Sequence, residues 1–329
     1  MSGAPVAARP QRCGAHLPDF LGIGAAKAGT TALHHYLAQH PEISMSRRKE
    51  PNFFIADEQP PQFGGPGDRT IINRDVIWRL ADYHRQFAGA RAGQMLGEIS
   101  PRYLGTPGAA ERIFARLPQA RLFAILRQPA ERAWSHFRMR RRDGFEPCAT
   151  LEEAIADEPR RIAENWASGR YLERGAYAAH LEPYLRLFPR EHLRVYLYDD
   201  LVADSNGLLR SLFTFLGVAP DFAPDTRQRP NRSGDLRNPL LRWLWTRTHS
   251  WRAPVRPLLP KALRSLVSRW VIAQPLVRAE IPAATRQWLT ALYTDEIRRL
   301  EVLLDRDLSA WHAAPATASR ASPPAVDRP

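Results

Sequence analysis

The chain contains very little cysteine and no long apolar run. Only two of its 329 residues are cysteine, Cys13 and Cys148, and they lie far apart. This usage excludes a cysteine-rich disulfide framework and offers no metal-binding spacing, so we expect a reducing compartment and no bound metal. No apolar run is long enough to span a membrane, and the first residues lack the apolar core of a signal peptide. The sequence therefore predicts a cytoplasmic protein, with peripheral attachment to a membrane left open.

Acidic residues are too few to balance the basic ones. The chain has 47 Lys and Arg against 34 Asp and Glu, a formal charge of +13, and a sequence pI of about 10.5. Such a balance predicts anionic partners, but it does not choose among nucleotide, acidic glycan, nucleic acid and lipid headgroups. Hydrophobic residues make up 44% of the chain, which is enough for a sizeable core. We favour one large domain.

The ends of the chain differ in composition from its middle. Residues 1–17 and 313–329 are rich in Ala, Pro and Ser, so we predict disorder there and a folded domain over residues 18–312. Within that domain apolar runs alternate with amphipathic segments, which predicts an α/β fold with a parallel sheet covered by helices on both faces and a helical C-terminal part. The apolar runs are residues 20–24, 94–100, 121–127 and 193–201; the amphipathic segments are 74–87, 107–116, 131–142, 151–165, 177–188, 207–216 and a final long one within 282–311.

The segment Gly22–Leu33, GIGAAKAGTTAL, is similar to a phosphate-binding loop with a displaced lysine. In nucleoside triphosphatases the lysine follows the second glycine, but here Thr30 has that position and Lys27 lies inside the loop. The loop follows an apolar run and precedes helical sequence, so its amides and the positive helix end favour an anion. Because the lysine that reaches a γ-phosphate is missing, a nucleotide with a short 5′ anion and no Mg²⁺ fits better than ATP.

A second stretch, Ala124–Phe137, has the sequence AILRQPAERAWSHF. Arg127 ends an apolar run, and Ser135 lies two turns into the helix predicted after it. A guanidinium at the carboxyl end of a strand and a hydroxyl on the next helix can bind one phosphate together. The alternative is that Arg127 forms an ordinary surface ion pair and Ser135 is solvated.

A third stretch, Ser46–Phe54, has the sequence SRRKEPNFF and carries one acid, Glu50, among basic residues. Neighbouring positive charge favours the ionised carboxylate, and an ionised carboxylate near a reactive group can act as a general base. The alternative is that Glu50 only balances the local positive charge.

In this order and spacing, the three stretches resemble the PAPS-dependent sulfotransferases, in particular the heparan sulfate sulfotransferase branch and its bacterial relatives. GAAKAGTTAL is similar to the 5′-phosphosulfate loop of that family, ILRQPAERAWSHF to its 3′-phosphate site, and KEPNFF to the segment with its catalytic glutamate. The resemblance covers most of Phe20–Trp311 and implies a P-loop-like central sheet.

The resemblance also implies a donor, 3′-phosphoadenosine 5′-phosphosulfate (PAPS), and a use for the displaced lysine. Lys27 would offset the charge that develops as the S–O bond breaks, and Glu50 would take the proton from the acceptor. No metal is then required. The donor-binding residues that it implies are Lys27, Ala28, Gly29, Thr30, Thr31, Arg127, Ser135, Arg232 and Gly234.

The chain departs from the heparan-type pattern at GEISPRYL, Gly97–Leu104. Relatives carry a lysine after the glutamate, whereas Ile99 follows Glu98 here and Arg102 precedes the tyrosine. This difference puts glycosaminoglycan specificity in doubt. Glu98 is an alternative acid for the site, although its place in a predicted strand favours a structural or positioning role equally.

Other polar residues receive structural interpretations. His34, His35 and His40 fall on the first predicted helix, where histidine is more often packed or exposed than catalytic. Asp199 and Asp200 follow a predicted strand as a metal-binding pair does, but a turn or helix cap explains them better.

Residues 236–278 have a different texture, with many arginines, four tryptophans and no acid. They predict either a basic amphipathic surface that rests on anionic lipid or a helical insertion whose Trp and Leu side chains face the sheet. Its prolines slightly favour the helical insertion. No recognised nucleic-acid-binding module is present, so we expect no nucleic acid partner.

The sequence as a whole predicts a sulfotransferase that modifies a hydroxyl, or less favourably an amine, of a carbohydrate-like, glycolipid or small hydroxylated acceptor. One alternative is a nucleotide kinase of the P-loop class, which would require Mg²⁺. The other is a non-catalytic protein that binds polyanions or membranes.

Overall fold

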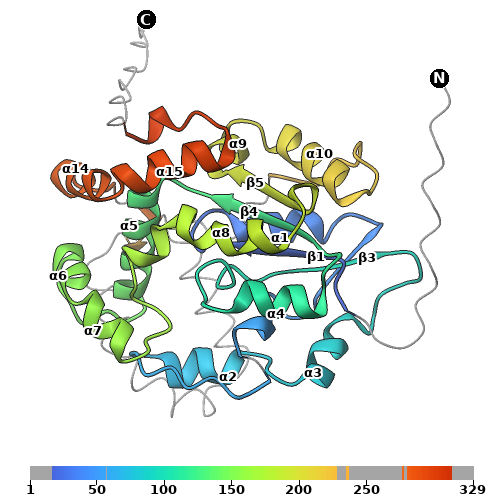
Figure 1. Ribbon diagram of the computed structural model, residues 1–329, viewed down its shortest axis with the longest axis horizontal. Coiled ribbons are helices and arrows are strands. Elements are labelled where there is room, and N and C mark those ends of the chain that lie inside the picture. The colour runs from blue at the N-terminus through green and yellow to red at the C-terminus, as the bar shows by residue number, and fades with distance from the viewer. Residues whose placement is uncertain (1–16, 57, 228–234, 237–275, 278–279, 313–329) are drawn as a thin grey trace, which may run out of the picture.

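The computed structural model describes residues 17–56, 58–227, 235–236, 276–277 and 280–312. A five-stranded sheet forms its centre, with the strand order β2-β3-β1-β4-β5 and parallel pairing throughout. The strands cross the middle of the molecule in Figure 1. They are β1 (Phe20–Gly24), β2 (Ile43–Met45), β3 (Met95–Ile99), β4 (Arg121–Leu126) and β5 (Leu193–Leu197).

The central strands are apolar because both faces of the sheet are covered. Every residue of β1 and β3 is buried, as expected for interior strands of a parallel sheet. The two strands also pack closely at one glycine. A Cβ on Gly97 would lie 2.0 Å from Cζ of Phe20, so the Phe20 ring lies over a site where a larger residue cannot fit.

The direction of each crossover decides which face a helix covers. The β1 to β2 connection runs one way along the sheet and the later connections run the other way, so right-handed crossovers put α1 (Thr30–Leu37) opposite α4 (Ala109–Arg116) and α8 (Tyr177–Leu187). Helix α15 (Thr294–Leu304) packs on α8. The predicted α/β fold, with helices on both faces and a helical C-terminal part, is confirmed.

Shorter elements connect this framework. Two longer helices are α5 (Pro129–Arg142) and α10 (Ser205–Leu216). The other helices among the described residues are α2 (Asn73–Asp75), α3 (Leu80–His84), α6 (Leu151–Ala156), α7 (Glu158–Ala163), α9 (Tyr198–Ala203) and α14 (Ala283–Leu292). Single turns are η1 (Phe53–Ile55), η2 (Asp68–Ile72), η3 (Arg85–Phe87), η4 (Glu173–Gly175), η5 (Arg190–His192) and η7 (Ser309–Trp311).

Some predicted helices are interrupted. Residues 151–165 form α6 and α7, and Pro159 lies in the first turn of α7, where a missing amide hydrogen costs least. The final long helix is two helices, α14 and α15, joined at Tyr293. The Tyr293 side chain is buried. Its hydroxyl group donates to the carbonyl oxygens of Tyr171 and Leu172, each at 3.0 Å. That tertiary contact is invisible in the amphipathic pattern.

The predicted disordered segments, 1–17 and 313–329, lie outside the described residues except for Leu17. The basic, tryptophan-rich segment 236–278 also lies almost wholly outside them. At its ends, β6 (Asp235–Leu236) and β7 (Leu276–Val277) pair as an antiparallel ladder. The chain therefore returns, after residues 237–275, to the place from which it left.

Candidate active site

The loop between β1 and α1 has the form of an anion cradle. Gly29 is the N-cap of α1 with a φ of 94°, a left-handed conformation that glycine adopts easily. A Cβ there would lie 2.9 Å from Leu201 Cδ2 and 3.1 Å from Tyr198 Cδ2, so space as well as conformation requires glycine. Thr30 and Thr31 begin α1, directly after this turn, so the positive end of the helix dipole lies at the loop.

Lys27 lies in the same loop, with a left-handed φ of 73°. Its Nζ is 3.4 Å from the sulfur of Met139, on α5. The pKa of Lys27 is lowered to about 8, mainly by burial and also by the charges of Arg142 and Arg127, while Asp143 and Glu50 act in the opposite direction. An ammonium group that is this poorly hydrated interacts strongly with an incoming anion.

Arg127 follows β4 at the same edge of the sheet. One of its terminal nitrogens is 3.5 Å from the carbonyl oxygen of Lys27, and the other pairs with Glu131 at 3.1 Å. The guanidinium lies 5.0 Å from the centre of the Tyr198 ring, and only 11% of the side chain is exposed. Arg127 is thus directed toward the loop, and its ion pair with Glu131 is largely buried rather than the surface pair of the alternative interpretation.

Ser135 is half-buried on α5. Met139, four residues later, lies on the same side of the helix and contacts Lys27. The side of α5 that bears Ser135 therefore faces the loop. Helix α5 begins as predicted: Pro129 is in its first turn, and the Gln128 side chain accepts a 2.8 Å hydrogen bond from the Glu131 amide.

Glu50 lies beyond the end of β2 and has a left-handed φ of 61°. Its carboxylate pairs with Lys49 at 2.5 Å, and 33% of the side chain is exposed. The negative charge of Glu50 raises the pKa values of Lys27 and Arg102, although burial lowers both overall. Glu50 therefore interacts with the lysine of the loop as well as with its sequence neighbour.

Glu98 is fully buried on β3 and accepts three hydroxyl hydrogen bonds. Tyr83 and Tyr103 donate to Oε1 at 2.5 and 2.8 Å, and Ser100 donates to Oε2 at 2.5 Å. The pKa of Glu98 is raised to about 7, mainly by burial and in part by the charge of Glu50, while the three hydroxyls act in the opposite direction. With its oxygens occupied in the core, Glu98 is badly placed to receive a proton from an acceptor.

Arg102, which precedes the tyrosine in GEISPRYL, also approaches this region. It donates to the carbonyl oxygen of Ala167 at 2.9 Å and to Ser168 Oγ at 3.1 Å. The pKa of Arg102 is lowered to about 10, mainly by burial and also by the charge of Arg174, while Glu50 acts in the opposite direction. The charge of Glu50 therefore acts on a cation in this segment, although Ile99 follows Glu98 where the resemblance predicts a lysine.

The remaining polar residues have mainly structural contacts. His40 is buried between the rings of Phe213 and Phe222, and its Nε2 lies 3.0 Å from the carbonyl oxygen of Ala219. Asp199 and Asp200 lie in the first turn of α9, beyond β5. They accept hydrogen bonds from Trp311 at 3.2 Å and Arg306 at 2.8 Å respectively.

His34 is the exception among these histidines. Its pKa is lowered to about 4, mainly by burial and also by the charge of Lys49, while Glu50 acts in the opposite direction. His34 is thus a neutral side chain at pH 7. His35 lies edge-on to the ring of Tyr36, with ring centres 6.0 Å apart.

Three further residues that interact with Lys27 or Arg127 were not indicated by the sequence patterns: Met139, Tyr198 and His136. His136 is buried on α5, and its pKa is well below the usual value because of burial, Arg132 and Arg140, with a smaller effect of Lys27. Met139 lies 112 residues from the lysine it contacts. Local sequence patterns cannot predict such long-range contacts, since they depend on how the sheet places α5 next to the β1–α1 loop.

Arg232 and Gly234, the proposed closing loop, lie outside the described residues. Within the part of the chain that the structure describes, no group of three or more His, Cys, Asp and Glu residues could hold a metal ion. No helix in that part is both long and apolar enough to cross a membrane.

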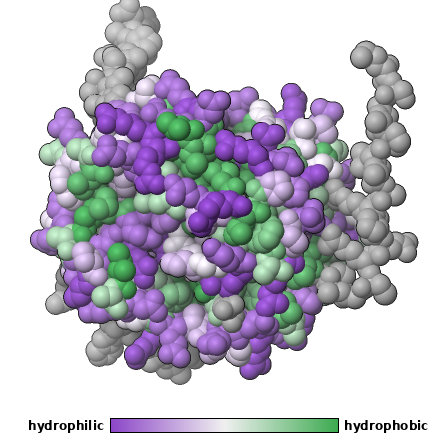
Figure 2. Space-filling view, viewed as in Figure 1, coloured by the Kyte–Doolittle hydropathy of each residue, from purple (hydrophilic) through white to green (hydrophobic). Residues whose placement is uncertain are grey.

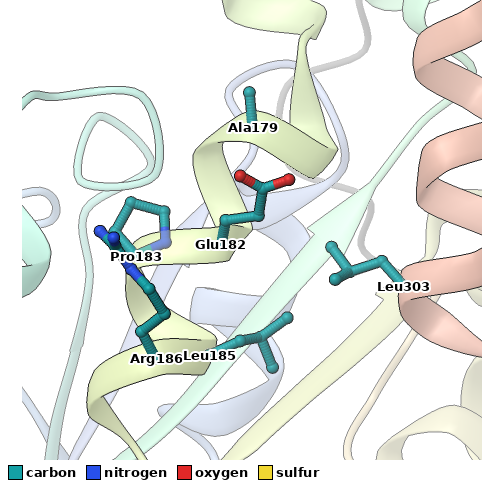
Figure 3. Close-up of a pocket in the computed structure, with 6 residues that line it drawn as sticks. All are labelled: Ala179, Glu182, Pro183, Leu185, Arg186 and Leu303. Carbon is teal, nitrogen blue, oxygen red and sulfur yellow. The ribbon is translucent and has the colours of Figure 1, made fainter.

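A groove of about 390 Å³ lies away from these residues, between α8 and the Leu303 side of α15 (Figure 3). Leu185, Leu303 and Pro183 line it together with Glu182 and Arg186. Hydrophobic and hydrophilic side chains are interspersed over the face that Figure 2 shows. We do not assign the groove to the site because none of the predicted site residues lines it.

Comparison with known proteins identifies the class of this protein. A model of the sulfotransferase family matches residues 18–222, more than half of the chain. The chain belongs to the sulfotransferase family. The crystal structure of a sulfotransferase from Alicyclobacillus acidocaldarius has a TM-score of 0.71 and 32% identity, over 91% of this chain and 100% of that one. The predicted family is thereby confirmed.

Curated relatives include the heparan sulfate enzymes that the resemblance indicated. The human bifunctional heparan sulfate N-deacetylase/N-sulfotransferase 3 is 32% identical over 213 residues, 63% of this chain and 23% of that protein. The mouse heparan sulfate glucosamine 3-O-sulfotransferase 6 is 30% identical over 218 residues, 66% of this chain and 56% of that protein. A membrane-associated sulfotransferase of Dictyostelium discoideum is 30% identical over 163 residues, which are 48% of this chain and 31% of that protein. The chain thus spans less than two thirds of each of these relatives.

Proposed function

We propose that this enzyme moves the sulfuryl group of PAPS to a hydroxyl, or less favourably an amine, of a carbohydrate-like or glycolipid acceptor. The observation that carries the proposal is the gathering of three separately predicted residues. Lys27 lies in the loop, Arg127 reaches the Lys27 carbonyl, and the charge of Glu50 acts on the Lys27 ammonium. A cation for the leaving group, a cation for a phosphate and a base are the groups that this transfer needs.

The loop would bind the 5′-phosphosulfate end of the donor. The amides of the Ala28–Thr31 segment and the threonine hydroxyls provide hydrogen bonds, and the start of α1 provides positive potential. Lys27 would stabilise the negative charge that develops on the phosphate as the S–O bond breaks. With a pKa of about 8, its ammonium is mostly protonated at pH 7.

Arg127 and Ser135 would bind the 3′-phosphate, which distinguishes this donor from ordinary nucleotides. Arg127 pairs with Glu131, so a phosphate must compete with that carboxylate for the guanidinium. The higher charge and the additional acceptor oxygens of a phosphate monoester favour it in that competition. Arg232 and Gly234 remain proposals for closure over the nucleotide.

Glu50 would act as the general base. As the acceptor oxygen attacks sulfur, its proton passes to the Glu50 carboxylate, and the bond from sulfur to the bridging oxygen breaks. Before the acceptor arrives, the carboxylate pairs with Lys49 at 2.5 Å. The names of the heparan sulfate relatives support a carbohydrate acceptor, and Arg102, whose pKa the charge of Glu50 raises, would lie on the acceptor side.

The test is transfer of labelled sulfate from PAPS to glycans, glycolipids and phenols, with EDTA present. Glu50→Gln keeps the shape of the side chain but cannot accept the proton, so turnover should fall by about 10²-fold or more while donor affinity stays within about threefold. Glu182→Gln, in an exposed ion pair with Arg299, is the matched control and should retain turnover. Normal turnover by Glu50→Gln would exclude the general-base role.

Two other functions remain as outcomes of the same experiments. A P-loop nucleotide kinase would transfer phosphate, and EDTA would stop it; Thr30 in the usual lysine position weakens this alternative. A polyanion- or membrane-binding protein would bind in a salt-sensitive way that survives the loss of Lys27.

We also propose a cytoplasmic location, with peripheral contact to anionic membrane through residues 236–278 as the alternative to a helical insertion packed on the sheet. The membrane-associated relative from Dictyostelium supports the proposal. Flotation with anionic and neutral vesicles tests it, since binding should require anionic lipid and weaken as salt rises. Trp243→Ser with Trp245→Ser should reduce flotation, and unfolding of that variant would favour a helical insertion packed on the sheet.

A further inference from the structure

The segment that carries Glu50 is held in an unusual conformation. Glu50 and Asn52 both have left-handed backbones, with φ angles of 61° and 57°, and neither is glycine. Non-glycine residues adopt this conformation at a cost, and two so close together persist only when their surroundings enforce them. The Asn52 side chain caps the turn by donating to the Glu50 carbonyl oxygen at 3.0 Å.

The backbone of this segment is tied to two hydroxyl groups. The Asn52 amide donates to Ser100 Oγ at 3.0 Å, and the Phe54 amide donates to the Tyr103 hydroxyl at 3.4 Å. Ser100 and Tyr103 are both fully buried. The protons of these same two hydroxyls go to Glu98, at 2.5 and 2.8 Å. Glu98 is therefore one hydroxyl away from both amides.

The carboxylate of Glu98 sets the direction of these hydrogen bonds. Its pKa is about 7, so it is ionised in slightly alkaline solution, and an ionised carboxylate only accepts. Under those conditions Ser100 and Tyr103 point their protons at Glu98 and present their lone pairs to the amides. If residue 98 could donate, one hydroxyl would turn its proton toward an amide, and donor would face donor. Buried polar networks of this kind are costly when one group is left unsatisfied.

We propose that Glu98 is a positioning residue for Glu50: through Ser100 and Tyr103 it fixes the backbone of residues 50–54, and thereby the Glu50 carboxylate, at the reaction centre. The role of Glu98 in positioning the Glu50 carboxylate for catalysis rests on the proposed function. The role of Glu98 in fixing the backbone of residues 50–54 is independent of that function. The side chains of the network are all fully buried, so none of them is exposed to solvent: Glu98, Tyr83, Ser100 and Tyr103.

The decisive variant is Glu98→Gln, which keeps the volume but adds a donor. Whichever way the amide is oriented, it donates to a hydroxyl that formerly pointed at the carboxylate. We expect hydrogen exchange of the Asn52 or Phe54 amide to accelerate at least tenfold. The Leu104 amide, which donates to Ile23 at 2.9 Å, should keep its protection. Unchanged exchange at both residues 52 and 54 would overturn the proposal.

Ser100→Ala removes the acceptor of the Asn52 amide, and it also removes one of the three hydroxyl donors of Glu98, while Tyr83 and Tyr103 still donate to that carboxylate. It should accelerate exchange at Asn52 and spare Phe54, and it keeps the proposal testable if Glu98→Gln does not fold. Tyr293→Phe is the control, because it also removes a buried hydroxyl that donates at 3.0 Å, but far from this network. It should leave exchange at both amides unchanged.

Turnover provides the second measurement. In Glu98→Gln, kcat should fall at least tenfold while affinity for the desulfated donor, 3′-phosphoadenosine 5′-phosphate (PAP), stays within threefold, since Lys27 and Arg127 are unchanged. Equal losses of PAP affinity and kcat would show general damage and overturn the positioning role. If exchange changes as expected but the wild-type enzyme transfers no sulfate, the proposed function fails and the backbone role of Glu98 stands.

Discussion

The buried ammonium group of Lys27 should lower the free energy of unfolding, and the size of this effect follows from its pKa. Burial is the main cause that lowers its pKa from 10.5 to about 8. This difference of about 2.5 pKa units corresponds to ~3 kcal/mol of stability lost by keeping the ammonium charged at neutral pH. The value is an upper limit, because a folded chain relaxes around a buried charge.

The informative change is Lys27→Met. Methionine is unbranched and pays the same backbone cost at a φ of 73°, so the comparison isolates the charge. We expect the variant to be more stable than the wild type by about 1–3 kcal/mol at pH 7, which raises Tm by about 2–4 °C per kcal/mol. Because the folded pKa is the lower one, wild-type stability should gain as pH rises from about 8 to 10.5, and the variant should lack that gain.

The same variant should lose its activity. Without the ammonium, turnover with labelled PAPS should fall by about 10²-fold or more. Calorimetric unfolding and sulfate transfer on one preparation give both values. Arg298→Met, which removes an exposed cation paired with Asp295, should change stability by less than about 0.5 kcal/mol and leave turnover intact. A Lys27→Met protein that is less stable than wild type yet transfers sulfate normally would refute the reasoning.

Three further predictions follow from the same contacts. Arg127→Ala should weaken PAP binding by about 2–4 kcal/mol and AMP binding much less; equal losses in calorimetry would exclude a 3′-phosphate role. PAP affinity of the wild type should fall above pH 8, by up to about tenfold per pH unit, as Lys27 loses its proton, and titrations of Lys27→Met should show no such fall. Arg161→Met should cost about 3–5 kcal/mol in urea unfolding, because the buried Glu146 carboxylate loses its cation and the two hydrogen bonds at 2.8 and 2.9 Å, and keeps only the neutral donors Tyr171 and Cys148. Adding Glu146→Gln should recover part of that loss, and no recovery would contradict the ion-pair explanation.

Local pattern was sufficient for most of the framework. Each predicted apolar run contains a strand, because strands buried on both faces must be apolar whatever their partners. Pattern was insufficient for β2, Ile43–Met45, which is only three residues long and lies at the edge of the sheet. It was also insufficient at Tyr293, where a buried tertiary contact accompanies the break between α14 and α15.

For the site, the sequence by itself determined the chemical groups and their order along the chain. A loop with Lys27, an arginine after a strand and an acid among basic residues could be found because each is a local pattern. Only the tertiary structure decided which of them act on one another. Arg127 meets the Lys27 carbonyl across 100 residues, and Glu98 reaches the Glu50 segment through hydroxyls at Ser100 and Tyr103. The reason is physical: burial, charge coupling and hydrogen-bond direction depend on distances in space, which the parallel sheet sets by aligning the ends of strands far apart in the chain.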